Sequence, residues 1–122
     1  MTTIYTASYR AYRPEHGQAV VTSLGLPKWR LPEAETWPRC WLIAPSSALF
    51  HGPAEEFEAG YRERLERFGP QKIARALEAI ARQHEADKLC LLCHEGDWLR
   101  CHRSQFATWW LTTTGELVRE VL

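Results

Sequence analysis

The sequence predicts an α/β fold, with a mainly parallel sheet flanked by helices in a Rossmann-like three-layer arrangement. The almost wholly apolar run KLCLLC at 88–93 is typical of a strand that is covered on both faces at the centre of a parallel sheet. Amphipathic helical patterns precede and follow this run, as expected for strand–helix–strand units. A chain of 122 residues is long enough for one compact domain, which we expect to span residues 1–122.

The amino-terminal part predicts two strands. Residues 2–7 form a β-prone run without a helical pattern, and residues 19–24 form a second apolar run that is ended by a glycine and a proline. An irregular, proline-rich stretch follows at 25–52, in which only residues 41–44 resemble a further short strand. Long loop-rich segments in small domains are usually functional, so this stretch is a candidate part of a site.

Two helices are expected next. From residue 54 to residue 68, apolar side chains recur at steps of four and glutamates occupy the first turn, where they complement the helix dipole. Gly69 and Pro70 end this helix and begin another, which runs to about Glu85.

The carboxy-terminal part predicts a helix and a strand after the central apolar run. A polar loop at 94–100 leads into a helix from about residue 101, whose apolar side carries phenylalanine and tryptophan. A glycine ends this helix, and residues 117–122 predict a last strand.

Charge and composition limit the classes of function. The chain has 15 basic and 15 acidic residues and a formal net charge of +0, so non-specific nucleic-acid binding is not expected. No apolar run is long enough to span a bilayer, and the first residues lack the pattern of a secretory signal. We therefore expect a cytoplasmic protein that makes no use of a membrane, with cysteines that stay reduced.

The densest chemistry lies between residues 89 and 104, which contain three cysteines, two histidines, two carboxylates and two arginines. Ligands of open α/β sheets bind beyond the carboxyl ends of the strands. Cys93 would lie at such an end, and Cys101, His102 and Arg103 would begin the next helix. Free N–H groups at a helix start favour an anion and a reactive thiol. The sequence therefore predicts the working site on the loop from Cys93 to Arg103.

The favoured interpretation of this loop is a site for a small molecule or nucleotide, and the sequence leaves open whether the protein is an enzyme. His102 and Glu95 are the candidate acid and base, Arg103 is the candidate anion contact, and Cys93 or Cys101 is a candidate nucleophile. The convergence of polar groups at a strand end supports this interpretation.

Zinc binding is an alternative, since Cys90, Cys93, Cys101 and His102 have the spacing C-x2-C-x7-C-H. A zinc C-x2-C pair needs a turn, however, and here two leucines of a strand separate the cysteines. Residues three apart on a strand face opposite ways. We therefore expect no metal, and nothing in the sequence indicates a cofactor.

Three further interpretations remain open. A phosphate-binding cysteine loop would need an arginine at position 99, where the chain has leucine, and the acidic residues of the loop would repel phosphate. Cys93 and Cys101 are also compatible with a redox pair. In a purely structural interpretation, Cys40, Cys90 and Cys93 are core residues and Glu95 pairs with Arg103. The tryptophans would then serve a protein-interaction module with a structural Cys/His loop.

A family signature matches the same residues. An apolar strand that ends in Leu-Leu-Cys, a glutamate two residues later and a Cys-His-Arg triplet correspond here to 91–93, Glu95 and 101–103. On these residues the chain resembles the DUF488 family of small α/β proteins of unknown function. The chain departs from the family in carrying His94, where members often have an aromatic or small residue.

The resemblance extends over nearly the whole chain. Family members begin with a strand that leads to threonine, serine and an aromatic residue, here Thr6, Ser8 and Tyr9. A proline, a basic residue and tryptophan follow the second strand, here 27–29. The resemblance implies the fold and the place of the site, and it suggests that ligand-binding residues approach the Cys93–Arg103 loop, namely Ser8, Tyr9, Lys28 and Trp29. It supplies no reaction, substrate or oligomeric state.

Overall fold

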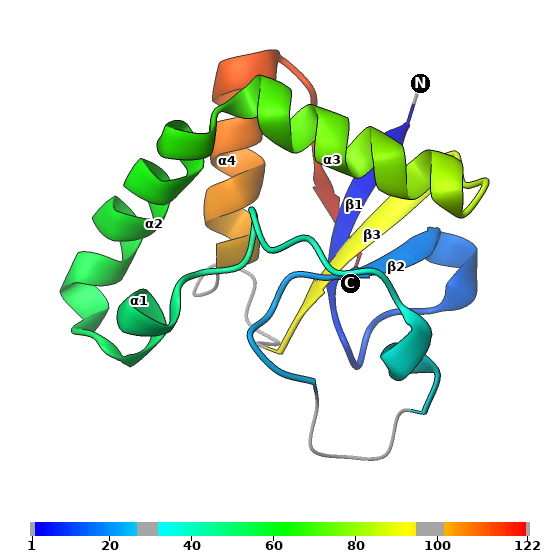
Figure 1. Cartoon of the computed structure of the whole chain (residues 1–122), viewed down its shortest axis with the longest axis horizontal. Coiled ribbons are helices and arrows are strands. Elements are labelled where there is room, and N and C mark those ends of the chain that lie inside the picture. The colour runs from blue at the N-terminus through cyan, green and yellow to red at the C-terminus, as the bar shows by residue number, and fades with distance from the viewer. Residues whose placement is uncertain (1, 27–31, 95–101, 122) are drawn as a thin grey trace.

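The computed structural model describes residues 2–26, 32–94 and 102–121 (Figure 1). Its strands form one sheet in the order β2-β3-β1-β4, and every pairing in the sheet is parallel. The predicted α/β class with a parallel sheet flanked by helices is therefore confirmed. The strands are β1 (Thr3–Ser8), β2 (Gln18–Val21), β3 (Lys88–Cys93) and β4 (Arg119–Glu120).

Three long helices share one face of the sheet with the main hydrophobic core. Leu89 and Leu91 of β3 and Ile4 of β1 belong to one buried cluster with side chains from all three helices. Figure 1 shows α3 lying across β1 and β3, with α2 and α4 next to each other. The helices are α2 (Ala54–Phe68), α3 (Pro70–Gln83) and α4 (His102–Thr114), and a short α1 (Ser47–His51) precedes them.

The opposite face of the sheet is covered by loops and two 3-10 helices, η1 (Pro14–His16) and η2 (Pro32–Thr36). Cys90 and Leu92 of β3 point to this face, where they pack with Tyr12 and Trp37 from the two covering segments. Because side chains alternate along a strand, β3 is buried on both faces, which explains its almost unbroken run of apolar residues.

Some predicted elements differ from the structure. Residues 41–44 form a turn and not a strand, because the carbonyls of Ile43 and Ala44 accept hydrogen bonds from the Tyr61 hydroxyl and the Arg64 guanidinium of α2. The second strand ends at Val21, and the last strand is only two residues long. Helix α1 was not predicted, although the Ser46 hydroxyl accepts from the Leu49 N–H at its start.

No helix in the described ranges is both long enough and apolar enough to cross a lipid bilayer.

Candidate functional site

The parallel register places the carboxyl ends of β1 and β3 at the same edge of the sheet. Ser8 is the partner of Cys93, and the Tyr9 N–H donates to the Cys93 carbonyl at 3.2 Å. Helix α4 begins at His102 beside this edge, and its second residue, Arg103, reaches back to Cys93. The structure thus brings together the predicted site residues Ser8, Tyr9, Cys93, His102 and Arg103.

Cys93 and Arg103 form a direct polar contact across this edge. Nη1 of Arg103 lies 3.0 Å from the Cys93 Sγ and 3.5 Å from the Cys93 carbonyl oxygen. Both residues are about 1% exposed. A guanidinium N–H that donates to sulfur favours the thiolate over the thiol, whereas burial of the sulfur acts in the opposite direction.

The same guanidinium is held from its other side by Glu120 of β4. Nη2 of Arg103 lies 2.9 Å from the Glu120 Oε2, and the Thr6 hydroxyl donates to the Glu120 Oε1 at 2.7 Å. Burial raises the pKa of Glu120, while the Thr6 hydroxyl and the Arg103 charge act in the opposite direction. Arg103 is therefore fixed between a sulfur and a carboxylate, and it joins α4 to β3 and β4.

His102 connects the start of α4 to the end of β2. Its Nε2 lies 3.0 Å from the Thr22 carbonyl oxygen, and since a carbonyl only accepts, Nε2 carries the proton in this contact. The Thr22 hydroxyl donates to the Leu92 carbonyl at 2.9 Å, which ties β2 to β3 at the same place. The buried ring of His102 also meets the Tyr61 ring edge-on.

Tyr9 lies on the other side of this edge and is also buried. The Ser23 hydroxyl donates to the Gly25 carbonyl at 2.6 Å, so the Tyr9 hydroxyl is the donor in its 2.7 Å contact with Ser23. Burial raises the pKa of Tyr9, which keeps the phenol neutral. The exposed His94 stacks at a tilt against the Tyr9 ring, with 5.1 Å between centroids, and its Nε2 lies 2.7 Å from the Gly25 carbonyl oxygen.

The cysteines of β3 face opposite sides of the sheet, as the sequence predicts. Cys90 belongs to the cluster on the face of Tyr12 and Trp37, whereas the Cys93 sulfur meets Arg103 of α4. Burial raises the pKa of the Cys90 thiol to about 12, and burial also raises the pKa of Cys40. Both thiols are therefore core residues, as expected.

The remaining site predictions fall on other parts of the chain. Glu95, Cys101, Lys28 and Trp29 lie outside the described residues, so their roles stay predictions. Ser8 uses its hydroxyl locally, as an acceptor for the Ala11 N–H at 3.2 Å. Sequence reasoning missed Glu120, for which the signal is the single carboxylate in the segment LVREVL at 117–122.

Comparison with known proteins gives one result. A family model described as a domain of unknown function, DUF488, matches residues 30–110, which is more than half of the chain. No curated protein and no solved structure matches it. The matched range includes β3, the start of α4, and Cys93 and Arg103, although it assigns no role to any single residue. The chain belongs to the DUF488 family.

Proposed function

We propose that this domain binds a small molecule or nucleotide at the carboxyl edge of its sheet, in a site where Cys93 serves as a nucleophilic thiolate. The observation that carries the proposal is the 3.0 Å contact between the Cys93 Sγ and the Arg103 Nη1. A guanidinium beside a thiol is one of the recognised ways in which proteins activate cysteine. A cytoplasmic location belongs to the same proposal, because a reducing compartment keeps the thiol free.

The geometry gives Arg103 a different role from the anion contact that the sequence indicates. Glu120 and Cys93 already occupy its guanidinium, and the side chain is buried, so a ligand anion would have to displace one of these partners. Arg103 is better placed to hold the sulfur in its charged form. If the domain is an enzyme, His102 and Glu95 are our candidate acid and base.

The interaction-module alternative has less support. Trp41 is 54% exposed, with the Arg39 guanidinium 5.1 Å from its ring centroid. Among the described residues Trp41 is the one exposed large aromatic side chain, and one such side chain does not by itself indicate a partner surface.

The proposal is tested by residue-resolved alkylation with iodoacetamide between pH 6 and pH 9, read by mass spectrometry. Cys90 is the internal control, because it is as buried as Cys93 but its thiol lacks the guanidinium contact. We expect Cys93 to react at least about ten-fold faster than Cys90 at pH 7, since a larger fraction of it is thiolate. Equal rates at the two positions would refute an activated Cys93.

Ligand binding is tested in the same series. A thermal-shift screen with nucleotides and metabolites is run on the natural chain and on Cys93→Ser. We expect hits that slow the alkylation of Cys93, because a molecule bound at the sheet edge covers the sulfur. Compounds that shift the melting temperature but leave the alkylation rate unchanged bind elsewhere and would count against the proposed site.

A further inference from the structure

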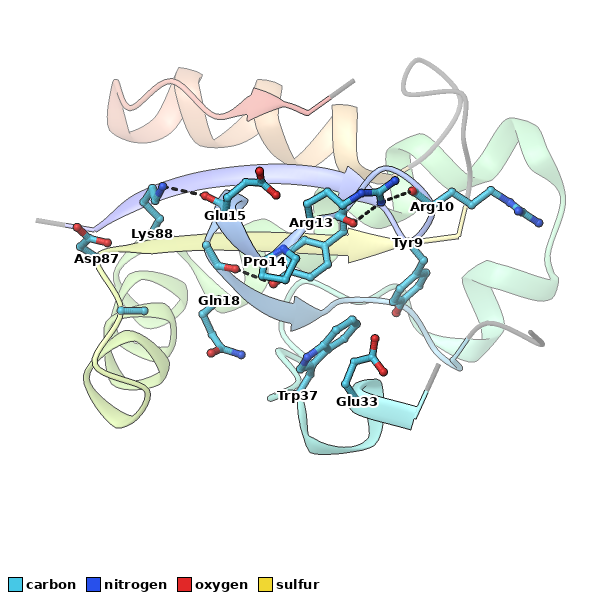
Figure 2. A pocket seen from close by; sticks show the side chains of 13 residues that line it. Tyr9, Arg10, Arg13, Pro14, Glu15, Gln18, Glu33, Trp37, Asp87 and Lys88 are labelled. Atoms are coloured by element: carbon cyan, nitrogen blue, oxygen red, sulfur yellow. Dashed lines mark hydrogen bonds between the residues drawn. The ribbon is translucent and has the colours of Figure 1, made fainter. Parts of the chain in front are cut away.

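A large cavity lies on the face of the sheet that the long helices leave uncovered. Its volume is about 1010 Å³, which is at the upper end for small-molecule sites. Its lining includes Tyr12 and Pro14 on one side and Glu33 and Trp37 on another. Figure 2 shows Pro14 apart from the neighbouring Glu33 and Trp37. Cys93 and Arg103 do not line this cavity.

The walls of the cavity provide two fixed aromatic rings. The rings of Tyr12 and Trp37 meet edge-to-face, with 5.4 Å between centroids. The Tyr12 hydroxyl donates to the Gly17 carbonyl at 2.8 Å, and burial raises the pKa of Tyr12, so this ring is a neutral phenol held in place. The two rings form a corner into which a flat or alkylated group fits.

The cationic side chains around the cavity are engaged by the protein itself. The Arg13 Nη1 donates to the carbonyls of Arg10 and Tyr12 at 3.1 and 2.8 Å, and the Lys88 ammonium donates to the Glu15 carbonyl at 2.9 Å. Figure 2 shows Arg10 extending away from Trp37. These hydrogen bonds occupy the Arg13 Nη1 and one donor of the Lys88 ammonium, while both side chains keep their positive charge.

The carboxylates around the cavity, unlike these cations, have no hydrogen-bond partner in the described structure. Within the described ranges, the side chains of Glu15, Glu33 and Asp87 form no ion pair and no hydrogen bond. Glu33 lies beside Trp37 on the same wall (Figure 2). Unpaired carboxylates next to aromatic faces are the features that attract an organic cation, through charge and through the ring quadrupole.

We infer that this cavity is a second binding site, specific for an organic cation that carries a planar or apolar group, such as an aryl amidine or a substituted ammonium. The planar group lies against Tyr12 and Trp37, and the positive charge lies near Glu33. The site is on the other face of the sheet from the sulfur of Cys93, so the inference does not depend on the function proposed above.

Three probes of nearly equal shape test the inference: benzamidine, which is cationic, benzamide, which is neutral, and benzoate, which is anionic. Each is titrated into the isotopically labelled full chain and followed by NMR. We expect benzamidine to shift the signals of Tyr12 and Trp37, and to bind at least about five-fold more tightly than benzamide, with benzoate weakest. Equal binding of benzamide, or tighter binding of benzoate, would overturn the inference.

Benzamidine binding to single-residue variants tests whether the cation binds beside Glu33. Glu33→Gln should weaken benzamidine about three-fold and leave benzamide unchanged, because only the charge is removed. Glu56→Gln, at an exposed position of α2, is the matched control and should change neither. Cys93→Ser should also leave benzamidine binding intact, which separates this site from the sheet edge. Equal effects of Glu33→Gln and Glu56→Gln would show that only the overall charge matters, and the inference would fail.

Discussion

The two faces of the sheet hold their polar groups in different ways. On the face that α4 covers, Thr6, Cys93, Arg103 and Glu120 are linked in one chain of short contacts, and Arg103 is about 1% exposed. On the other face, Glu15, Glu33 and Asp87 are exposed around an open cavity and have no ionic partner in the described structure. In the first arrangement the polar groups bind one another, whereas in the second the carboxylates stay exposed to solvent.

This comparison predicts that replacing a polar residue lowers the free energy of unfolding much more on the face covered by α4 than at an exposed position. Arg103→Ala should lower the free energy of unfolding by about 3 kcal/mol or more, because it leaves the Glu120 carboxylate in a largely buried place without its cation. Urea denaturation measures the change. The control is Arg62→Ala, which removes an exposed pair with Glu66 and should cost less than about 0.5 kcal/mol. Similar losses for the two variants would contradict the comparison.

On the face that carries the cavity, we expect stability to depend on the backbone conformation at Gly17 more than on the exposed charges. Gly17 ends the loop that carries Tyr12 and has φ of 119°, and a Cβ there would lie 2.7 Å from the Lys88 carbonyl oxygen. Gly17→Ala should therefore cost about 2 kcal/mol, through both the conformation and the contact with β3. Relief of this clash would displace the loop and with it the Tyr12 ring, so benzamidine binding should also weaken.

Gly25→Ala is the matched control for this substitution. A Cβ at Gly25 would meet no atom within 4 Å, so we expect little change in the urea midpoint or in benzamidine binding. A stable Gly17→Ala variant with unchanged benzamidine affinity would show that the loop and its wall adapt, and that the cavity is not preformed.

The sequence predicts best those elements that local pattern determines. The bounds of β3 were predicted as Lys88–Cys93 because a strand buried on both faces consists of consecutive apolar residues. Helix α2 was predicted at 54–68 because its apolar period ends at Gly69 and Pro70. The approach of Ser8 and Tyr9 to Cys93 is what the family resemblance suggests, and the parallel pairing of β1 with β3 accounts for it.

The sequence fails where distant segments decide the structure. Residues 41–44 have the composition of a strand, yet their carbonyls bond to side chains of α2 about twenty positions away. The pairing of Arg103 with Glu120 depends on β4 lying beside β1, which no local pattern indicates. The cavity is not predictable from the sequence either, because the Tyr12 loop and η2 that line it come together only in the folded protein.

The smallest effect that we predict concerns Glu120 and its dependence on pH. Burial raises the pKa of this carboxyl above its ordinary value of 4.5, so the folded state binds the proton more tightly than the unfolded chain does. Its contribution to stability is therefore fully present below pH 4.5 and is lost as the pH rises through the folded pKa. Glu120→Gln removes this titrating group, so the stability of the variant should change less between pH 4.5 and pH 7 than that of the natural chain.

Glu120 and the Cys93 sulfur also share one guanidinium, which links this pH effect to the reactivity of the thiol. When Glu120→Gln removes the competing carboxylate, more of the Arg103 charge acts on the sulfur, and alkylation of Cys93 at pH 7 should become about three-fold faster. Urea denaturation at the two pH values and the alkylation rate are measured on the same variant. Slower alkylation in this variant would mean that Glu120 keeps Arg103 in position on the sulfur and does not compete for its charge.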